Sequence, residues 1–174
     1  MDSQTATERF ERLFRDHYGR VLSYARRRTS AATADDVVAE TFLIAWRRLE
    51  SIPRAELPWL LGVARRVLAN QRRRETTQAR LAVRVADKPA ASPPAEAAPD
   101  PELERALAEL GDRDRELLRL IAWDGLTPAE AARVLGWTPV VARVRLHRAR
   151  RRLETLLSPP TTKETRWKTT GSTS

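Results

Sequence analysis

The sequence contains no cysteine and only two histidines, His17 and His147, which lie far apart in the chain. Without cysteine there can be no disulfide bonds, no thiol chemistry and no cysteine zinc sites. Two distant histidines do not provide a histidine-based metal centre or a catalytic triad. The carboxylates are scattered along expected helices, so the sequence offers no metal-binding or nucleophilic arrangement. We therefore expect a protein that is not an enzyme and that binds no cofactor.

Long apolar segments are also missing. No apolar run approaches the roughly 20 residues that cross a bilayer, and the N-terminal stretch MDSQTATERFERLF has neither the basic nor the apolar region of a signal peptide. We accordingly expect a cytoplasmic protein without membrane insertion. Alternating strand patterns and hairpin dipeptides are absent too, whereas apolar residues recur at helical spacing. The sequence therefore predicts an all-α fold.

Negative charge is in the minority, because 23 acidic residues stand against 32 basic ones and the net charge is +9. An excess of this size indicates a polyanionic partner, either nucleic acid or an anionic membrane surface. Of the basic residues, 29 are arginine, whose guanidinium group suits bidentate phosphate and guanine contacts. A GC-rich genome explains the preference for arginine equally well, but it does not explain why the arginines cluster.

A stretch rich in proline and alanine, ADKPAASPPAEAAPDP at residues 86–101, divides the chain. It has no amphipathic face, and its composition is typical of an extended linker. We predict two small helical domains, at residues 7–75 and 102–157, joined by a Pro/Ala-rich linker at residues 76–101. The polar segment 158–174 is expected to be a disordered tail.

Three helices are expected in the first domain. In the first helix, apolar residues recur at helical spacing: Phe10, Leu13, Phe14, Tyr18, Val21, Leu22 and Ala25. The second is expected to begin at Thr33, with Asp36 as its capping-box partner. Its middle, residues 37–46, is apolar around much of the circumference, so it is either buried on several sides or reserves one side for a partner. The third helix, 58–74, begins with a proline and ends in arginines.

The second domain carries a helix-turn-helix pattern. Thr127 and Glu130 form a capping-box sequence with a proline between them, and Gly136 follows the last apolar residue of that short helix. Thr138 and Pro139 then begin another helix. Two helices joined by a short turn containing glycine are typical of the helix-turn-helix motif.

The last helix of this motif holds six arginines within residues 143–152 and no acidic residue. Its buried stripe is expected to be Ala142, Leu146, Ala149 and Leu153. The opposite face carries Pro139 and the predicted contacts to duplex DNA: Val140, Arg143, Val144, His147, Arg148 and Arg151. A recognition helix reads bases with its N-terminal part and contacts phosphates further on, which agrees with this order. The alternative is an ordinary helical hairpin with a solvated basic face.

A second arginine cluster lies at the end of helix 58–74. It consists of Arg65, Arg66, Arg72, Arg73 and Arg74 around Asn70 and Gln71. Taken alone, this cluster is equally consistent with a solvated face and with a nucleic-acid surface. Together with the first cluster it suggests two separate contacts on one polyanion.

Three segments together resemble the extracytoplasmic-function (ECF) sigma factors of bacterial RNA polymerase. They are DDVVAETFLIAWRRL, PWLLGVARRVLANQRRR and LTPAEAARVLGWTPVVARVRLHRARRRL, with the Pro/Ala linker before the last. The resemblance covers about residues 8–157, and the order of the motifs is more specific than any one of them. It implies a sigma factor that binds core RNA polymerase, recognises promoter DNA and helps to open it for transcription initiation. It also allows an anti-sigma factor as a further partner.

The resemblance assigns a role to each domain. The first would bind core polymerase and the minus-ten element, and the second the minus-thirty-five element and the polymerase flap. The residues that would face the polymerase are Asp35, Asp36, Val38, Glu40, Phe42 and Trp46. The loop ESIPRAEL and helix 58–74 would hold the displaced strand, which needs phosphate contacts and a pocket for an unstacked base. The expected donors there are Arg65, Arg66, Asn70 and Arg72.

The sequence departs from the family pattern at several positions. Ala39 stands where the family often has glutamine, Arg66 where it often has asparagine, and Val141 and Val144 where small hydroxyl residues are usual. The promoter sequence that family members recognise therefore cannot be carried over to this chain, although the way in which their recognition helix docks on DNA can. The main alternative is an autonomous helix-turn-helix regulator, which would bind DNA as a dimer and would need a self-complementary face in its first domain.

Overall fold

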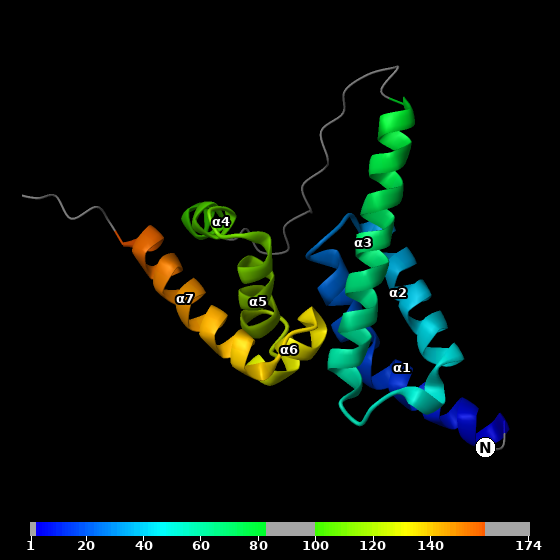
Figure 1. Cartoon of the computed structure of the whole chain (residues 1–174). Helices are drawn as coiled ribbons and strands as arrows, with labels where there is room; N and C mark the ends of the chain where they lie inside the picture. The colour runs from blue at the N-terminus through cyan, green and yellow to red at the C-terminus, as the bar shows by residue number, and fades with distance from the viewer. Residues whose placement is uncertain (1–2, 83–99, 159–174) are drawn as a thin grey trace, which may run out of the picture.

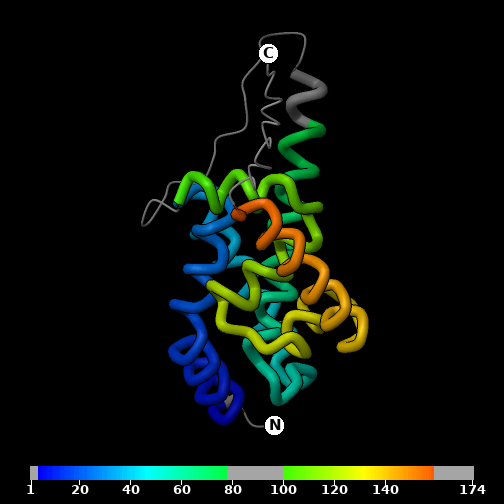
Figure 2. Tube along the Cα trace, turned by 90° about the vertical axis from the view of Figure 1, so that its left-hand side faces the viewer, coloured from blue at the N-terminus to red at the C-terminus, as the bar shows by residue number. Residues whose placement is uncertain are grey.

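The computed structural model describes residues 3–82 and 100–158, and every regular element in these two ranges is a helix (Figure 1). The predicted all-α class is therefore confirmed for the described part of the chain. Most of the predicted linker and the predicted tail lie outside the described residues. The helices form two groups, α1 to α3 and α4 to α7, which lie side by side, and the second group lies in front of the first in Figure 2.

The first group contains α1 (Ser3–Arg26), α2 (Ala31–Arg47), a short 3₁₀ turn (Leu49–Ser51) and α3 (Glu56–Ala82), and all three helices pack against one another. The α3 helix continues beyond residue 75, where the linker was expected to begin. The buried side chains at its centre come from every one of these helices: Leu13, Val21, Tyr24, Val37, Phe42, Leu60, Leu61, Ala64 and Leu68.

Two details of this group differ from the sequence predictions. The α2 helix begins at Ala31, and the side chain of Ser30 accepts a hydrogen bond from the Thr33 amide. The predicted start at Thr33 with an Asp36 capping box is therefore wrong. In α1, Leu13 and Val21 are buried as the spacing predicts, whereas Phe14 and Tyr18 remain about two-fifths exposed.

The second group contains α4 (Pro101–Ala108), α5 (Asp112–Ala122), α6 (Pro128–Leu135) and α7 (Pro139–Leu157). The predicted capping box is confirmed, because Thr127 and Glu130 exchange side-chain to backbone hydrogen bonds at the start of α6. The backbone amide and the hydroxyl of Thr127 both donate to the Glu130 carboxylate, and these two hydrogen bonds lower the pKa of Glu130. Thr138 caps α7 in the predicted place. Figure 1 shows α7 on the outer side of the second group, away from α1 to α3.

The turn between α6 and α7 depends on a left-handed residue. Gly136 has a φ of 71°, a conformation that side chains with a Cβ rarely adopt. A Cβ at this position would meet no atom within 4 Å, so a substitution would cost only backbone strain.

We expect Gly136→Ala to lower the free energy of unfolding by about 1–2 kcal/mol. The same change at Gly19, an open position inside α1, should instead stabilise the protein by about 0.5–1 kcal/mol, because alanine is the better helix former. Thermal unfolding followed by circular dichroism measures both. Effects of the same sign in the two variants would show that the turn does not constrain Gly136.

The two groups are in direct contact. Helix α6 packs against α3, and a Cβ at Gly62 of α3 would lie only 3.9 Å from the Cα of Val134 in α6. The buried apolar residues of both groups consequently form one continuous cluster. This contact places the helix-turn-helix beside the arginine-rich third helix.

Candidate nucleic-acid and polymerase interfaces

The outer face of α7 carries all the predicted duplex-DNA contacts. Ala142, Leu146 and Ala149 are buried against the other helices, as their spacing predicts. The six residues of the opposite face are all exposed: Val140, Arg143, Val144, His147, Arg148 and Arg151. Val140 is 60% exposed, and Val141 and Val144 nearby are 43% and 46% exposed, so three valines reach the surface of these turns.

One arginine of the α7 cluster has a structural role instead. The Nε of Arg145 donates to a carboxylate oxygen of Asp114 in α5 at 2.7 Å, and its guanidinium lies 5.0 Å from the centre of the Trp137 ring. This arginine therefore fastens α7 to α5 and is half-buried. No local sequence pattern indicates this contact, because the two partners are 31 positions apart.

The arginines of α3 divide between two faces. Arg66 and Asn70 are exposed and lie one turn apart on the same side of the helix. Arg72 lies on another side, where its Nη2 donates to the backbone carbonyl of Arg28 at 3.0 Å. Arg65 is partly buried. Of the four residues predicted to hold the strand, Arg66, Asn70 and Arg72 are exposed, and Arg66 and Asn70 are the two that share one side of α3.

Arg66 borders a pocket of about 460 Å³ at the junction of the two helix groups. The loop before α3 contributes Pro53 and Arg54, the first turn of α3 contributes Trp59, and α6 contributes Arg133. Three guanidinium groups and an indole ring around one opening can contact phosphates and stack on a base. This pocket coincides with the loop and helix that the sequence predicted for the displaced strand.

The predicted polymerase residues of α2 fall on two sides of the helix. Asp35, Asp36, Glu40 and Trp46 are exposed, whereas Val38 and Phe42 are 4% and 3% exposed and belong to the core. The sequence prediction therefore included two residues that cannot present their side chains to a partner. Leu43, which the prediction omitted, is 42% exposed and lies one turn before Trp46.

An aromatic cluster continues this face onto α1. The rings of Phe10 and Trp46 lie 5.1 Å apart, those of Phe14 and Phe42 4.7 Å, and those of Phe14 and Tyr18 4.9 Å. Phe14, Tyr18 and Trp46 are all at least 38% exposed. The helical spacing of α1 predicted that its aromatic residues belong to the core. It could not show that the neighbouring helices cover only some of them, so that Phe14 and Tyr18 remain partly exposed.

Within the described ranges, no group of histidine, aspartate and glutamate side chains is arranged to hold a metal ion. None of the helices described is both long and apolar enough to span a membrane.

Comparisons with known proteins agree with this arrangement. The family description "Sigma-70 region 2" matches residues 13–78, and "Sigma-70, region 4" matches residues 101–153. The ECF RNA polymerase sigma factor SigL of Mycobacterium tuberculosis is 33% identical over 157 residues, which cover 83% of this chain and 86% of SigL. The chain belongs to the ECF sigma factor family.

Two further comparisons extend this identification. The probable RNA polymerase sigma factor RfaY of Xanthomonas campestris is 34% identical over 154 residues, and the match spans 76% of this sigma factor but 38% of RfaY. The fold is shared with the sigma factor RpoE from Bartonella quintana, solved in complex with the anti-sigma factor NepR. That match has a TM-score of 0.64 and 24% identity, and covers 85% of this chain and 96% of RpoE.

Proposed function

We propose that this sigma factor directs core RNA polymerase to promoters through three separate surfaces. The exposed face of α2 contacts the polymerase, the loop before α3 together with Arg66 and Asn70 holds the displaced strand of the minus-ten element, and the outer face of α7 reads the minus-thirty-five element. As an initiation factor the protein is not itself an enzyme, and its work with the polymerase places it in the cytoplasm. The proposal includes an anti-sigma factor as a further partner, since RpoE was solved with one.

The arrangement of α7 carries this proposal. Its first two turns expose valines and Arg143, which suit thymine methyl groups and guanine edges in the major groove. Its later turns expose Arg148 and Arg151, which suit phosphates. The buried stripe lies on the other side, so docking α7 in a groove requires no unfolding. Three valines exposed between 43% and 60% on these turns support a face that contacts a partner.

A reconstitution experiment tests the proposal as a whole. The purified chain is mixed with core RNA polymerase and a library of templates that are randomised in the minus-ten and minus-thirty-five regions, and run-off transcripts are selected. We expect a complex of the two proteins and enrichment of one promoter sequence. Tight dimeric binding to a palindrome without polymerase, and no transcript with it, would instead indicate an autonomous regulator.

Two arginines of α7 should differ in what they read. We expect Arg143→Ala to relax the preference at one base pair, with a loss of roughly 1–3 kcal/mol against the best site. Arg148→Ala should weaken binding to all sequences about equally and reduce the salt dependence by about one ion. Competition binding on the selected promoter and its single-base variants, at several salt concentrations, measures both. If the two variants give the same profile, the proposed order of contacts along α7 is incorrect.

A further inference from the structure

The four residues that connect the 3₁₀ turn to α3, residues 52–55, form one wall of the proposed strand-binding pocket, and we call them the strand-binding loop. Ile52, at the first end of the loop, is 6% exposed and belongs to the core. Pro53 and Arg54 are exposed and border the pocket. Burial therefore fixes one end of the loop, and the place of Arg54 depends on how the other end is held at the start of α3.

A histidine of α1 contacts that other end. Nε2 of His17 lies 3.0 Å from Oε2 of Glu56, which is the first residue of α3. A carboxylate only accepts hydrogen bonds, so the imidazole donates. The side chains of His17 and Glu56 are 19% and 23% exposed, so the contact is largely shielded from water. This contact holds the first turn of α3, to which the pocket residues Pro58 and Trp59 belong.

A second contact from the same side of α1 reaches the first end of the loop. Nη2 of Arg9 donates to the backbone carbonyl of Ile52 at 3.5 Å, which is a long hydrogen bond. Leu13 lies between Arg9 and His17 in the sequence and is 1% exposed. Residues that recur every four positions share one side of a helix. One side of α1 therefore contacts both ends of the strand-binding loop.

His17 and Arg9 do not themselves border the pocket, whose walls come from the loop, from α3 and from α6. A site that binds an unstacked base needs its groups to be held to within about 0.5 Å of the productive geometry, and the residues behind the site provide this precision. A loop that contains two exposed residues, Pro53 and Arg54, cannot gain such precision from its own packing. The contacts from α1 supply it.

We propose that His17 is a positioning residue for the melted promoter strand, because through Glu56 it holds the strand-binding loop and the first turn of α3 so that Arg54 and Trp59 flank the pocket. Arg9 supports the same loop from its other end. The inference rests on the proposed function for the meaning of the pocket. The contacts of α1 with the loop and with α3 are independent of that function.

A pair of substitutions at His17 tests the hydrogen bond. His17→Leu removes the donor, whereas His17→Gln places an amide nitrogen close to the position of Nε2 and keeps it. With core polymerase and the selected promoter, we expect His17→Leu to slow promoter opening about tenfold and His17→Gln to slow it by less than about twofold. Permanganate reactivity followed over time measures the rate of opening. Equal rates in the two variants would overturn the proposal.

Binding to the closed duplex separates positioning from a general loss of folded protein. It should stay within about twofold of the unsubstituted chain in both His17 variants, because α7 is untouched. A variant that has merely lost folded protein would lose closed-duplex binding and opening to the same extent, and that result would contradict the proposal. Circular dichroism and co-purification with core polymerase determine the folded and assembled fraction to which both rates are normalised.

A second background shows whether His17 acts through the loop. Arg54→Ala removes a side chain that His17 is proposed to position, and we expect it to slow opening about tenfold by itself. Adding His17→Leu to this variant should then slow opening by less than about threefold further. Independent effects would multiply to about a hundredfold, because distant and uncoupled substitutions are additive in free energy. A hundredfold loss in the double variant would therefore refute a role through Arg54.

The contact can be tested without transcription, so that its failure is distinguishable from failure of the proposed function. Thermal unfolding of His17→Leu, Glu56→Leu and the combined variant forms a double-mutant cycle. We expect the combined variant to melt close to the less stable of the two single variants. Additive shifts of the melting temperature would show that the contact is absent. If the unsubstituted chain opened no promoter, the proposed function would be refuted, and this cycle would still decide whether α1 holds the start of α3.

Discussion

Replacing Asp36 and Glu40 together by arginine is expected to weaken the binding of core RNA polymerase by about a hundredfold. Both carboxylates are exposed on the face of α2 that the family resemblance assigns to the polymerase clamp. If they meet basic residues there, each reversal replaces attraction by like-charge repulsion, and a cost of about 1.4 kcal/mol for each of the two exposed charges amounts to a hundredfold. Co-purification and fluorescence titration with labelled core polymerase measure the change.

The structure removes one complication from this test, namely a loss of helix capping at Asp36. Because Ser30 caps α2, the reversal at Asp36 does not remove a helix cap. A matched control reverses two exposed glutamates of the second group, Glu109 and Glu154, and should leave polymerase affinity within a factor of about two, as expected for charges outside a contact. A folded double variant at Asp36 and Glu40 with undiminished affinity would place the polymerase contact elsewhere.

The second large effect is expected from Arg66→Ala combined with Asn70→Ala. These side chains share one exposed face of α3, and Arg66 borders the pocket proposed for an unstacked base. Loss of contacts to one or two held bases costs about 1–3 kcal/mol each, so promoter opening should fall by roughly a hundredfold. Permanganate reactivity of the minus-ten region on the selected promoter measures opening.

Binding to the closed duplex should survive in this variant, because α7 is untouched. A template melted beforehand over the minus-ten region should restore much of the transcription, since the opening step is no longer needed. The matched control is Arg73→Ala with Arg74→Ala, which removes two exposed arginines further along α3. If this control loses as much opening as Arg66→Ala with Asn70→Ala, the effect reflects general positive charge and not the pocket.

The parts of the fold that the sequence predicted best are those with local signals. The capping box at Thr127 and Glu130, the left-handed Gly136 and the cap at Thr138 each depend on residues within about four positions, and the structure confirms all of them. The start of α2 was mispredicted because Ser30 and Thr33 both fit a helix cap. The pattern favoured Thr33 with its acidic partner, but Ala31 and Ala32 extend the helix by one further turn.

The candidate sites could be predicted only in part. When a helix is apolar on most sides, its sequence does not show which side faces the core. The sequence therefore could not show that Val38 and Phe42 are buried whereas Trp46 is exposed. The partners of Arg145 and Arg28 lie 31 and 88 or more positions away, and no local pattern indicates such a pairing. The number of arginines in the sequence is therefore larger than the number whose side chains are available to bind DNA.

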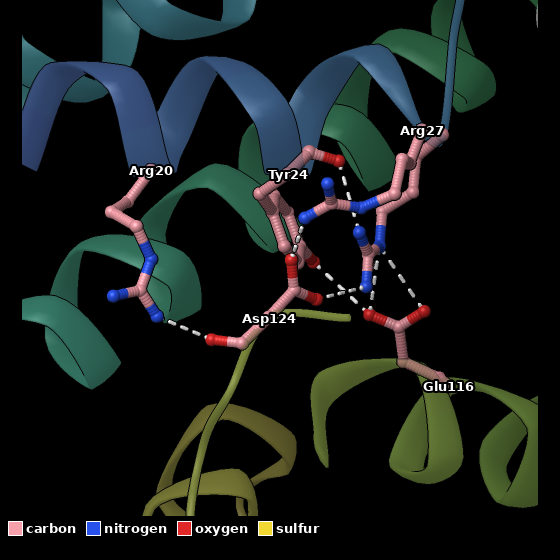
Figure 3. Close-up of polar contacts among 6 residues, drawn as sticks. Arg20, Tyr24, Arg27, Glu116 and Asp124 are labelled. Atoms are coloured by element: carbon pink, nitrogen blue, oxygen red, sulfur yellow. Dashed lines mark hydrogen bonds and ion pairs between the residues drawn. The ribbon is translucent and has the colours of Figure 1, made fainter. Parts of the chain in front are cut away.

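Arg28, which follows α1, forms ion pairs with Glu116 of α5 and with Asp124, which follows α5 (Figure 3). These ion pairs join parts of a single chain, and this has a consequence for dilution. An intramolecular contact has an effective concentration that the connection sets, commonly in the millimolar range, so diluting the protein does not open it. Only a ligand that prefers the separated domains can do so. If one molecule in a hundred is separated at equilibrium, such a ligand binds a hundredfold more weakly than its intrinsic affinity, a difference of about 2.7 kcal/mol. Substitution of Arg28 would thus raise the apparent affinity of any ligand that prefers the separated groups, without touching the surface that this ligand contacts.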